Sequence, residues 1–288
     1  MRRFHAARAT AILLLGGVLM IGAAGASSRA PKVHIVNVVA RDFALELPAS
    51  IPAGLTAFQL KNLGKVGHHM SIVRLDSGRT APEALREIMR IGRAPRPEWM
   101  HPVGGPQNAA PGKGSNAIVM LEPGNYLAFC EMPGPDTTAH YMRGMAKAFT
   151  VTGPARAVES AQGDDTLALS DFAFTWAHPL TSGIHTVAVI NRGKQPHMVV
   201  VVRLPKGVTL DDFTAWAKNP QGRPSPAIVA SGVTEIPVGA TVVFGERFEP
   251  GNYGMVCFIP DRTDGRPHLA HGMKAVFTVP APRGSTLR

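Results

Sequence analysis

Cysteine and aromatic residues are scarce in this sequence, which has two cysteines, three tryptophans and three tyrosines among 288 residues. Because two cysteines can form only one bridge, a small fold held together by several disulfides is excluded. Runs of lysine or arginine are also missing, so no nucleic-acid partner is predicted. The formal charge of +10 is spread along the chain. It indicates at most a mildly cationic surface for an acidic partner or membrane headgroups.

Long apolar runs are absent except near the N-terminus. Three arginines precede an apolar stretch over residues 11–25, which leads into Ala24-Gly25-Ala26. This order is typical of a secretory signal peptide, and the stretch is shorter than the roughly 20 residues of a membrane-spanning helix. We predict cleavage of residues 1–26 after Ala26, and a periplasmic or secreted protein without a transmembrane segment. An uncleaved N-terminal anchor is the alternative.

The main feature that is present is a long repeat. Gly124-Asn125-Tyr126 leads to Cys130, and Gly251-Asn252-Tyr253 leads to Cys257. Each cysteine is followed by a His-x4-Met unit that ends in Gly-Met, at His140 to Met145 and at His268 to Met273. Because the cysteines hold equivalent places in the two copies, a disulfide between them is not expected.

The repeat extends far upstream of the cysteines. The segment NLGKVGH, ending at His68, matches NRGKQPH, ending at His197, and Asp42-Phe-Ala-Leu matches Asp171-Phe-Ala-Phe. A period this long predicts tandem domains and not a solenoid of short repeats. We expect a first domain over residues 32–152, a linker over 153–165, a second domain over 166–280 and a tail over 281–288.

Short apolar segments rich in β-branched residues recur in both halves, separated by glycine and proline turns. They predict six or seven strands per half and an antiparallel sandwich. The expected strands cover residues 33–39, 55–60, 70–75, 117–121, 126–130 and 147–151 in the first half, and 166–170, 185–190, 198–204, 241–248, 253–258 and 274–279 in the second.

One helix is expected at the same place in each half. Thr80 with Glu83, and Thr209 with Asp212, have the spacing of a capping box. The apolar periodicity that follows predicts helices to about residues 91 and 217. After each helix comes a proline- and glycine-rich loop, over residues 93–114 and 219–239.

The repeated residues have the chemistry of a copper site. Each cysteine ends a predicted strand, so the loop that follows can bring ligands to its sulfur. His68 and His197 begin another strand after a turn and can approach the same end of a sandwich. A thiolate, two imidazoles and a weak thioether are a donor set for copper. Zinc on the cysteine and the histidines, with methionine idle, is the alternative.

Each half resembles a cupredoxin, the blue-copper fold of plastocyanin, azurin and sulfocyanin, over almost all of the chain after residue 26. The resemblance implies an all-β chain of two tandem Greek-key cupredoxin-like β-sandwiches, each with one short helix. It implies up to two copper ions, one per domain. The ligands would be His68, Cys130, His140 and Met145 in the first domain, and His197, Cys257, His268 and Met273 in the second. Nine or ten residues separate each cysteine from its histidine, which is more than in the familiar blue-copper loops.

Three neighbouring residues compete for these places. His69 adjoins His68, but adjacent side chains on a strand face opposite ways, so only one of them can point into a site. The repeat aligns His68 with His197, which makes His68 the expected ligand. We expect His271 outside the ligand set, beside the site or in solvent, and Met142 in packing.

The sequence favours an exported copper-binding protein that transfers electrons to or from a redox protein. Copper delivery or buffering with a copper-exchange partner is one alternative, and a metal-free cupredoxin-like module that binds another partner is a second. Multicopper oxidases and copper nitrite reductases place further coppers on histidines arranged as His-x-His or His-Cys-His. The chain contains neither pattern, so we predict that it is not an enzyme.

Overall fold

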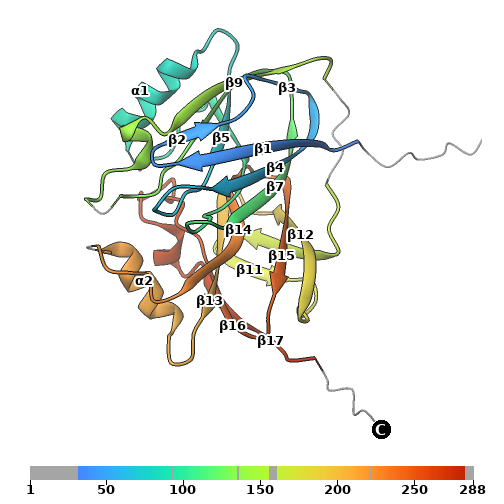
Figure 1. The fold of residues 1–288 in the computed structure, drawn as a ribbon, viewed down its shortest axis with the longest axis vertical. Coiled ribbons are helices and arrows are strands. Elements are labelled where there is room, and N and C mark those ends of the chain that lie inside the picture. Colours follow the sequence, from blue (N-terminus) through green and yellow to red (C-terminus); the bar gives the residue numbers. More distant parts are fainter. Residues whose placement is uncertain (1–31, 93, 135, 156–160, 221, 283–288) are drawn as a thin grey trace, which may run out of the picture. The chain divides into compact units, whose positions relative to one another are not determined.

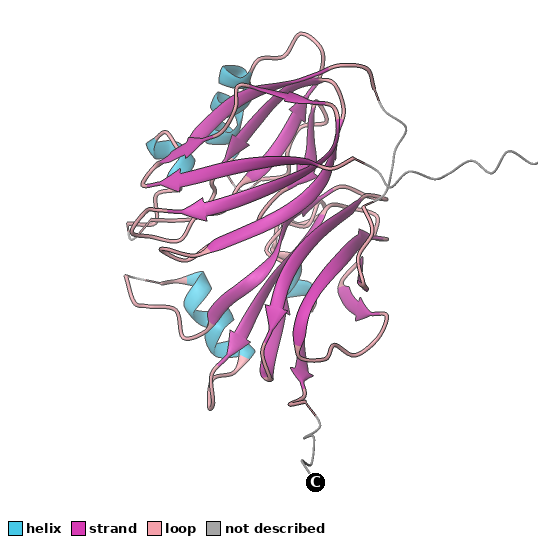
Figure 2. Ribbon diagram, turned by 45° about the vertical axis from the view of Figure 1, so that its right-hand side comes forward, coloured by secondary structure: helices cyan, strands magenta, loops and turns pink. Residues whose placement is uncertain are grey.

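The computed structural model describes residues 32–92, 94–134, 136–155, 161–220 and 222–282. The predicted signal peptide, part of the predicted linker and most of the predicted tail lie outside these residues. Strands dominate the described chain and helices are few (Figure 1, Figure 2).

The first half has nine strands, one α-helix and one 3-10 turn among its described residues. They are β1 His34–Arg41, β2 Ala44–Glu46, β3 Ser50–Pro52, β4 Gly54–Asn62, β5 Ser71–Leu75, α1 Ala81–Ile91, β6 Met100–Gly104, β7 Gly114–Leu121, β8 Gly124–Phe129, η1 His140–Arg143 and β9 Ala146–Thr152.

The second half repeats this order with eight strands among its described residues. They are β10 Asp165–Ser170, β11 Ala173–Trp176, β12 Gly183–Asn191, β13 His197–Leu204, α2 Leu210–Lys218, β14 Ile228–Ile236, β15 Thr241–Phe248, β16 Gly251–Val256, η2 His268–His271 and β17 Lys274–Val279.

Each half is a β-sandwich. In the first half one layer has the order β2-β1-β4-β7 and the other β3-β9-β8-β5-β6. In the second half the layers are β11-β10-β12-β15 and β17-β16-β13-β14. The chain crosses between the two layers several times, for example from β2 to β3, from β3 to β4 and from β4 to β5. The predicted all-β fold of two sandwiches with one short α-helix each is confirmed.

The sheets are mixed and not purely antiparallel, so the prediction of an antiparallel sandwich is wrong in this detail. β1 runs parallel to β4, β10 parallel to β12, and β3 parallel to β9. In the first half the chain crosses to the other layer at β3 before it returns as β4. β4 therefore enters its sheet from the same end as β1.

Burial alternates along the strands. Val36, Val38 and Ala40 of β1 are buried, whereas the residues between them are more exposed. A period of two is expected where one face of a strand lies on the core and the other does not. The buried side chains of β1 therefore face the sandwich interior.

The repeated Gly-Asn-Tyr unit closes the turn into β8 and β16. Gly124 has φ 150°, a conformation that side chains disfavour. Tyr126 is buried, donates its hydroxyl proton to the carbonyl of Glu122 at 2.7 Å and stacks on Phe149. Tyr253 makes the equivalent contacts in the second half. This part of the repeat serves the fold.

Both predicted helices are confirmed. Thr80 caps α1 and Thr209 caps α2, and each hydroxyl accepts the backbone N–H three residues on. The acids there, Glu83 and Asp212, accept the threonine N–H in return. α2 ends at Lys218, one residue beyond the prediction. Among the described residues no helix is long and apolar enough to cross a membrane.

The prediction of an uninterrupted loop after each helix is wrong, because each of these two segments contains a strand. β6 pairs with β5, and β14 pairs with β13. Both are outermost strands of their layers, and Pro102 lies within β6. Proline lacks a backbone N–H but is tolerated at a sheet edge. The proline and glycine content therefore concealed two edge strands.

Strands β7 and β15 join one layer of each half into a single eight-stranded sheet (Figure 1). Ile118 pairs with Val243 across this junction. The side chain of Asn116 accepts the N–H of Gly245 at 2.7 Å and donates to its carbonyl at 2.9 Å. The described residues of both halves thus form one compact unit, and the predicted domain boundaries stay a prediction.

A buried group of ion pairs also crosses the junction. Arg96, in the loop after α1, donates from Nη2 to Glu131 at 2.7 Å and from Nε to Glu235 of β14 at 2.8 Å. The Arg96 side chain is only 10% exposed. One buried cation therefore pairs with a carboxylate from each half.

Candidate metal centres

In each half the predicted ligands come from three neighbouring segments. His68 lies in the turn before β5, Cys130 directly follows β8, and His140 opens η1, which is followed by Met145. The second half places its four residues likewise, with His197 at the start of β13, Cys257 after β16, His268 at the start of η2 and Met273 after it.

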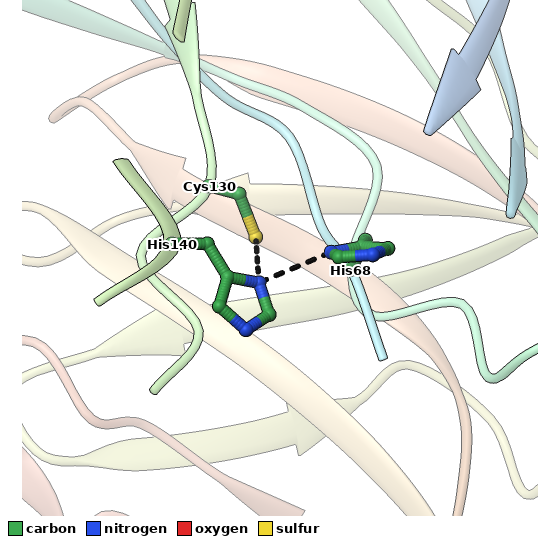
Figure 3. A group of neighbouring side chains, drawn as sticks. All are labelled: His68, Cys130 and His140. Carbon is green, nitrogen blue, oxygen red and sulfur yellow. Dashed lines mark hydrogen bonds between the residues drawn. The ribbon is translucent and has the colours of Figure 1, made fainter. Parts of the chain in front are cut away.

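The first centre brings two histidines and one cysteine together (Figure 3). Nδ1 of His68 lies 3.0 Å from Nδ1 of His140, which in turn lies 3.5 Å from Sγ of Cys130. All three residues are at most 1% exposed. Figure 3 shows the sulfur and the two facing nitrogens converging between the side chains.

The second centre has the same geometry. Nδ1 of His197 lies 2.9 Å from Nδ1 of His268, and Nδ1 of His268 lies 3.4 Å from Sγ of Cys257. All three residues are fully buried. The two halves therefore place the same three donors at nearly the same separations.

The long loop between each cysteine and its histidine folds outward and returns. A bridge closes each loop just before the histidine. The bridges join Pro133 with Ala139 and Pro260 with Pro267. The extra residues therefore lie beyond the bridge and leave His140 and His268 facing their cysteines.

Backbone hydrogen bonds hold each methionine next to this group. The N–H of Cys130 donates to the carbonyl of Met145, and the N–H of Met145 donates to the carbonyl of His140, both at 3.1 Å. Met273 makes the same pair of bonds in the second half, and both methionines are fully buried. Gly144 ends η1 with φ 97°, which accounts for the glycine of the Gly-Met unit.

Each sulfur is buried and accepts backbone hydrogen bonds. The N–H of His69 donates to Cys130, and the N–H of Met198 donates to Cys257, both at 3.4 Å. Both cysteines are free. Burial raises the pKa of each thiol to about 12. A cation that binds the sulfur has to displace this proton.

His140 and His268 are neutral at neutral pH. Burial lowers the pKa of His140 to about 4, and the neighbouring His68 lowers it further by charge repulsion. Burial likewise lowers the pKa of His268 to about 4, with His197 adding repulsion. Neutral imidazole is the form that binds a metal ion.

The donor separations fit a transition-metal ion. Two nitrogens bound at about 2.0 Å to one tetrahedral ion lie about 3.3 Å apart, and a nitrogen and a sulfur at about 2.0 and 2.3 Å lie about 3.5 Å apart. The corresponding distances are 3.0 and 3.5 Å in the first centre. The facing Nδ1 atoms of His68 and His140 have room for at most one proton between them. At least one lone pair therefore points into the centre.

Sequence reasoning missed a carboxylate behind each centre. Oδ1 of Asp42 lies 2.9 Å from Nε2 of His68, and Oδ1 of Asp171 lies 2.6 Å from Nε2 of His197. Burial raises the pKa of Asp42, but hydrogen bonds from Lys65 and His68 outweigh it and hold this pKa below its usual range. The signal was the repeat of Asp-Phe-Ala at offset 129, which the sequence analysis gave no role.

A phenylalanine covers the first centre. The ring of Phe43 lies 4.9 Å from that of His140, and the guanidinium of Arg143 lies 4.7 Å from the Phe43 ring on the outside. Met142, beside Arg143, is 52% exposed. The expectation that Met142 serves packing is therefore wrong, because η1 turns this side chain to the surface.

Phe172 covers the second centre in the same way. Its ring lies 5.0 Å from His268 and stacks on His271 at 4.9 Å. Nε2 of His271 lies 3.2 Å from Asp264. His271 therefore contacts Phe172 and Asp264, and His268 is the histidine that faces the cysteine sulfur.

His69 faces away from the first centre. Its Nε2 accepts the N–H of Glu131 at 2.9 Å, and burial lowers its pKa. His68 is the member of the adjacent pair that meets Cys130, as the repeat alignment predicted.

Neither a protein-family model nor a characterised protein matches the sequence. Solved structures do. The dithionite-reduced auracyanin of Roseiflexus castenholzii is 19% identical, over 43% of this chain and 99% of that one, with a TM-score of 0.32. Auracyanin A of Chloroflexus aurantiacus, a "blue" copper protein, is 18% identical over 42% and 100%, with a TM-score of 0.31.

A longer match exists to a multicopper oxidase. It is 12% identical, covers 86% of this chain and 89% of that one, and has a TM-score of 0.24. At these identities the similarity concerns the fold alone. The solved structures to which this chain is similar include auracyanins, an azurin, a multicopper oxidase and a copper-containing nitrite reductase.

Proposed function

We propose that the chain is an exported copper protein with one mononuclear, type 1-like site in each half, and that it transfers electrons. In this proposal the first ion is held by His68, Cys130, His140 and Met145. The second is held by His197, Cys257, His268 and Met273. Each copper supplies a one-electron Cu(I)/Cu(II) couple when bound.

The duplicated, buried set of two facing Nδ1 atoms and one Sγ supports the proposal most. A thiolate with imidazoles and a thioether suits copper, whereas magnesium and calcium prefer oxygen donors. Met145 and Cys130 are tied to each other and to His140 by backbone bonds. Such anchored donors move little when the charge of a bound ion changes by one.

Electron transfer without catalysis is the second part of the proposal, with a redox protein as partner. Phe129 and Glu131 flank Cys130, and Val256 and Phe258 flank Cys257. Neither cysteine has a histidine next to it in the sequence that could bridge to a further copper. The proposed protein therefore has two separate centres and no substrate site built on them.

Export is proposed from the leader sequence before Ala26. The expected mature protein begins near residue 27 and acts in the periplasm or outside the cell. N-terminal sequencing of the protein recovered from the periplasm or medium of an expressing culture checks the cleavage site.

Copper binding is tested on residues 27–288 by adding Cu(II) and recording visible absorption and bound copper per chain. We expect an intense blue band and up to two coppers. Cys130→Ser and Cys257→Ser should each remove part of the band. His178→Gln, at an exposed histidine outside both centres, should leave it unchanged.

The same titration separates the alternatives. Stoichiometric copper without the blue band, insensitive to redox cycling, supports delivery or buffering in place of electron transfer. Stronger retention of Zn(II) than of either copper ion supports a zinc site. The absence of any stoichiometric metal would leave a metal-free partner-binding module and sink the proposal.

A further inference from the structure

Each centre has one histidine whose outer nitrogen meets a carboxylate. The pair Asp42 and His68 has an Oδ1 to Nε2 distance of 2.9 Å, and the pair Asp171 and His197 has 2.6 Å. Both histidine side chains are fully buried, whereas the carboxylates are 26% and 22% exposed. The carboxylate thus lies between the buried ring and the surface.

The same carboxylate holds the segment that carries the histidine. Both oxygens of Asp42 accept the N–H of Lys65, at 3.0 and 2.9 Å. In the second half Oδ2 of Asp171 accepts the N–H of Lys194 at 2.9 Å. Each aspartate therefore binds the backbone three residues before its histidine as well as the ring.

A glycine leaves the space through which the carboxylate reaches the ring. A Cβ at Gly64 would lie 2.3 Å from Oδ1 of Asp42 and 2.7 Å from Nε2 of His68. At Gly193 the corresponding distances are 2.4 Å to Asp171 and 2.5 Å to His197. Any side chain at either position would separate the two groups.

An asparagine fixes this glycine in place. Oδ1 of Asn62 accepts the N–H of Gly64 at 2.7 Å, and its Nδ2 donates to the carbonyl of Val66 at 2.7 Å. Asn191 makes the same contacts around Gly193. Both asparagines are fully buried. The backbone of the turn therefore holds the aspartate and the histidine in contact in both halves.

We infer that Asp42 and Asp171 are positioning residues, which fix the proton of His68 and His197 on Nε2 and keep the Nδ1 atom that faces the second histidine of the centre unprotonated. We call the group of aspartate, glycine and histidine in each half the carboxylate clamp: Asp42, Gly64 and His68, and Asp171, Gly193 and His197. The copper consequences below rest on the proposed function, whereas the placement of the proton does not.

The clamp has a chemical consequence for a bound ion. A carboxylate that accepts the outer N–H of a ligand imidazole makes the facing nitrogen a stronger donor, and loss of such a partner lowers metal affinity by about 10 to 100-fold. The negative charge favours the more highly charged ion, so Cu(II) gains more than Cu(I). Each tenfold change in that preference corresponds to 59 mV for a one-electron couple.

The proton placement is measured first, by 15N NMR of the histidine rings in the metal-stripped full-length chain. We expect both His68 and His197 as the neutral Nε2–H form. Asp42→Ala should release His68 into a mixture of tautomers and leave His197 unchanged, and Asp171→Ala should do the reverse. Gly64→Ala should act like Asp42→Ala because its methyl group separates the carboxylate from the ring.

The charge is tested by Asp42→Asn, which keeps the shape and removes the negative charge. With Cu(II) and Cu(I) competitors as probes, we expect the first centre to lose about 10 to 100-fold in Cu(II) affinity and less in Cu(I) affinity. Its reduction potential should rise accordingly. Asp76→Asn is the matched control, because Asp76 pairs with exposed His101 at 2.6 Å outside both centres.

Two results would overturn the inference. One is a wild-type chain whose His68 and His197 carry the proton on Nδ1. The other is an Asp42→Asn protein whose ratio of Cu(II) to Cu(I) affinity equals that of Asp76→Asn. If the wild-type chain binds no copper, the proposed function fails, and the tautomers of the alanine variants still decide whether the clamp exists.

Discussion

The two halves share their donors and differ in what surrounds the sulfur. After Cys130 comes Glu131, which pairs with buried Arg96, whereas after Cys257 comes Phe258. The residue that donates its N–H to the sulfur also differs, His69 in the first half and Met198 in the second. The first sulfur therefore has an ionisable residue directly after it in the chain where the second has an apolar one, while burial and, after it, the carboxylate of Glu235 of β14 raise the pKa of Cys257.

This difference affects the reduction potential expected of each centre, while the donor atoms are the same in both halves. Burial raises the pKa of Glu131, but Arg96 and His69 outweigh it and keep this carboxyl ionised. Hydrogen bonding and polarity around a cysteine sulfur adjust the reduction potential of a copper centre. An anion beside Cys130 favours the more oxidised ion, so we expect the first centre to have the lower potential.

The largest effect is expected when one cysteine is replaced, because this removes one centre and keeps the other. Cys130→Ser should abolish copper binding in the first half, and Cys257→Ser in the second, because serine supplies no thiolate. Each variant should retain one copper, which isolates the spectrum and potential of the remaining centre. Loss of both coppers in either variant would contradict two independent sites. Copper analysis with visible spectroscopy measures this.

Arg96→Met breaks the buried ion pairs at the junction. It leaves Glu131 and Glu235 without their cation, and removing one partner of a buried pair costs about 3–5 kcal/mol in unfolding free energy. Urea unfolding measures the loss. Arg41→Met, in a surface pair whose side chains are 53% and 55% exposed, should cost at most about 1 kcal/mol. Equal losses would mean that the Arg96 group does not hold the halves together.

The halves should respond alike to pH. The folded pKa of about 4 for His140 and His268 lies below the unfolded value of about 6.5. The unfolded chain therefore binds more protons between these values, and stability falls as pH drops from about 6.5 toward 4. His140→Gln and His268→Gln should each reduce this acid loss in urea unfolding of the metal-stripped chain. If only one of the two variants reduced the acid loss of stability, the two halves would differ in their response to pH.

The same linkage acts with opposite sign at alkaline pH. The folded thiol pKa of about 12 for Cys130 and Cys257 exceeds the unfolded value of about 8.5. Stability should therefore fall as pH rises above about 8.5, because the unfolded thiols lose protons that the folded ones retain. A flat urea midpoint between pH 8 and 10 would contradict the buried, protonated thiols.

Glu131→Gln gives the smallest effect and tests the comparison directly. It removes the anion next to Cys130 and leaves the second half unchanged. The potential of the first centre should rise toward that of the second, by less than about 59 mV, one tenfold change in ion preference. Redox titration of Glu131→Gln in the Cys257→Ser background measures it. A fall in potential would mean that Arg96 dominates the field at Cys130.

The repeat predicted most of the strands, both capped helices and the three residues that meet in each centre. Short apolar segments rich in β-branched residues and capping boxes are local signals in the sequence, and each corresponds to a local element of the structure. The contact between Asp42 and His68 is not local. It depends on a turn with space at Gly64, which a sequence shows only as one glycine among thirty.

The parallel pairs and the junction were unpredictable for a related reason. Whether β4 runs parallel to β1 depends on a crossing at β3 of only three residues. The partner of Arg96 in the second half, Glu235, lies 139 residues away. Burial patterns identify faces of strands, but they do not specify which edge of one half meets which edge of the other.

The pairing of β7 with β15 makes each repeat the cover of the other's open edge. A single repeat produced alone would expose a row of unpaired backbone N–H and C=O groups along that strand. Such an edge can pair with the same edge of another copy. Isolated halves are therefore expected to self-associate or exchange strands. In the tandem chain the two halves cover these edges within one molecule, which opposes such polymerisation.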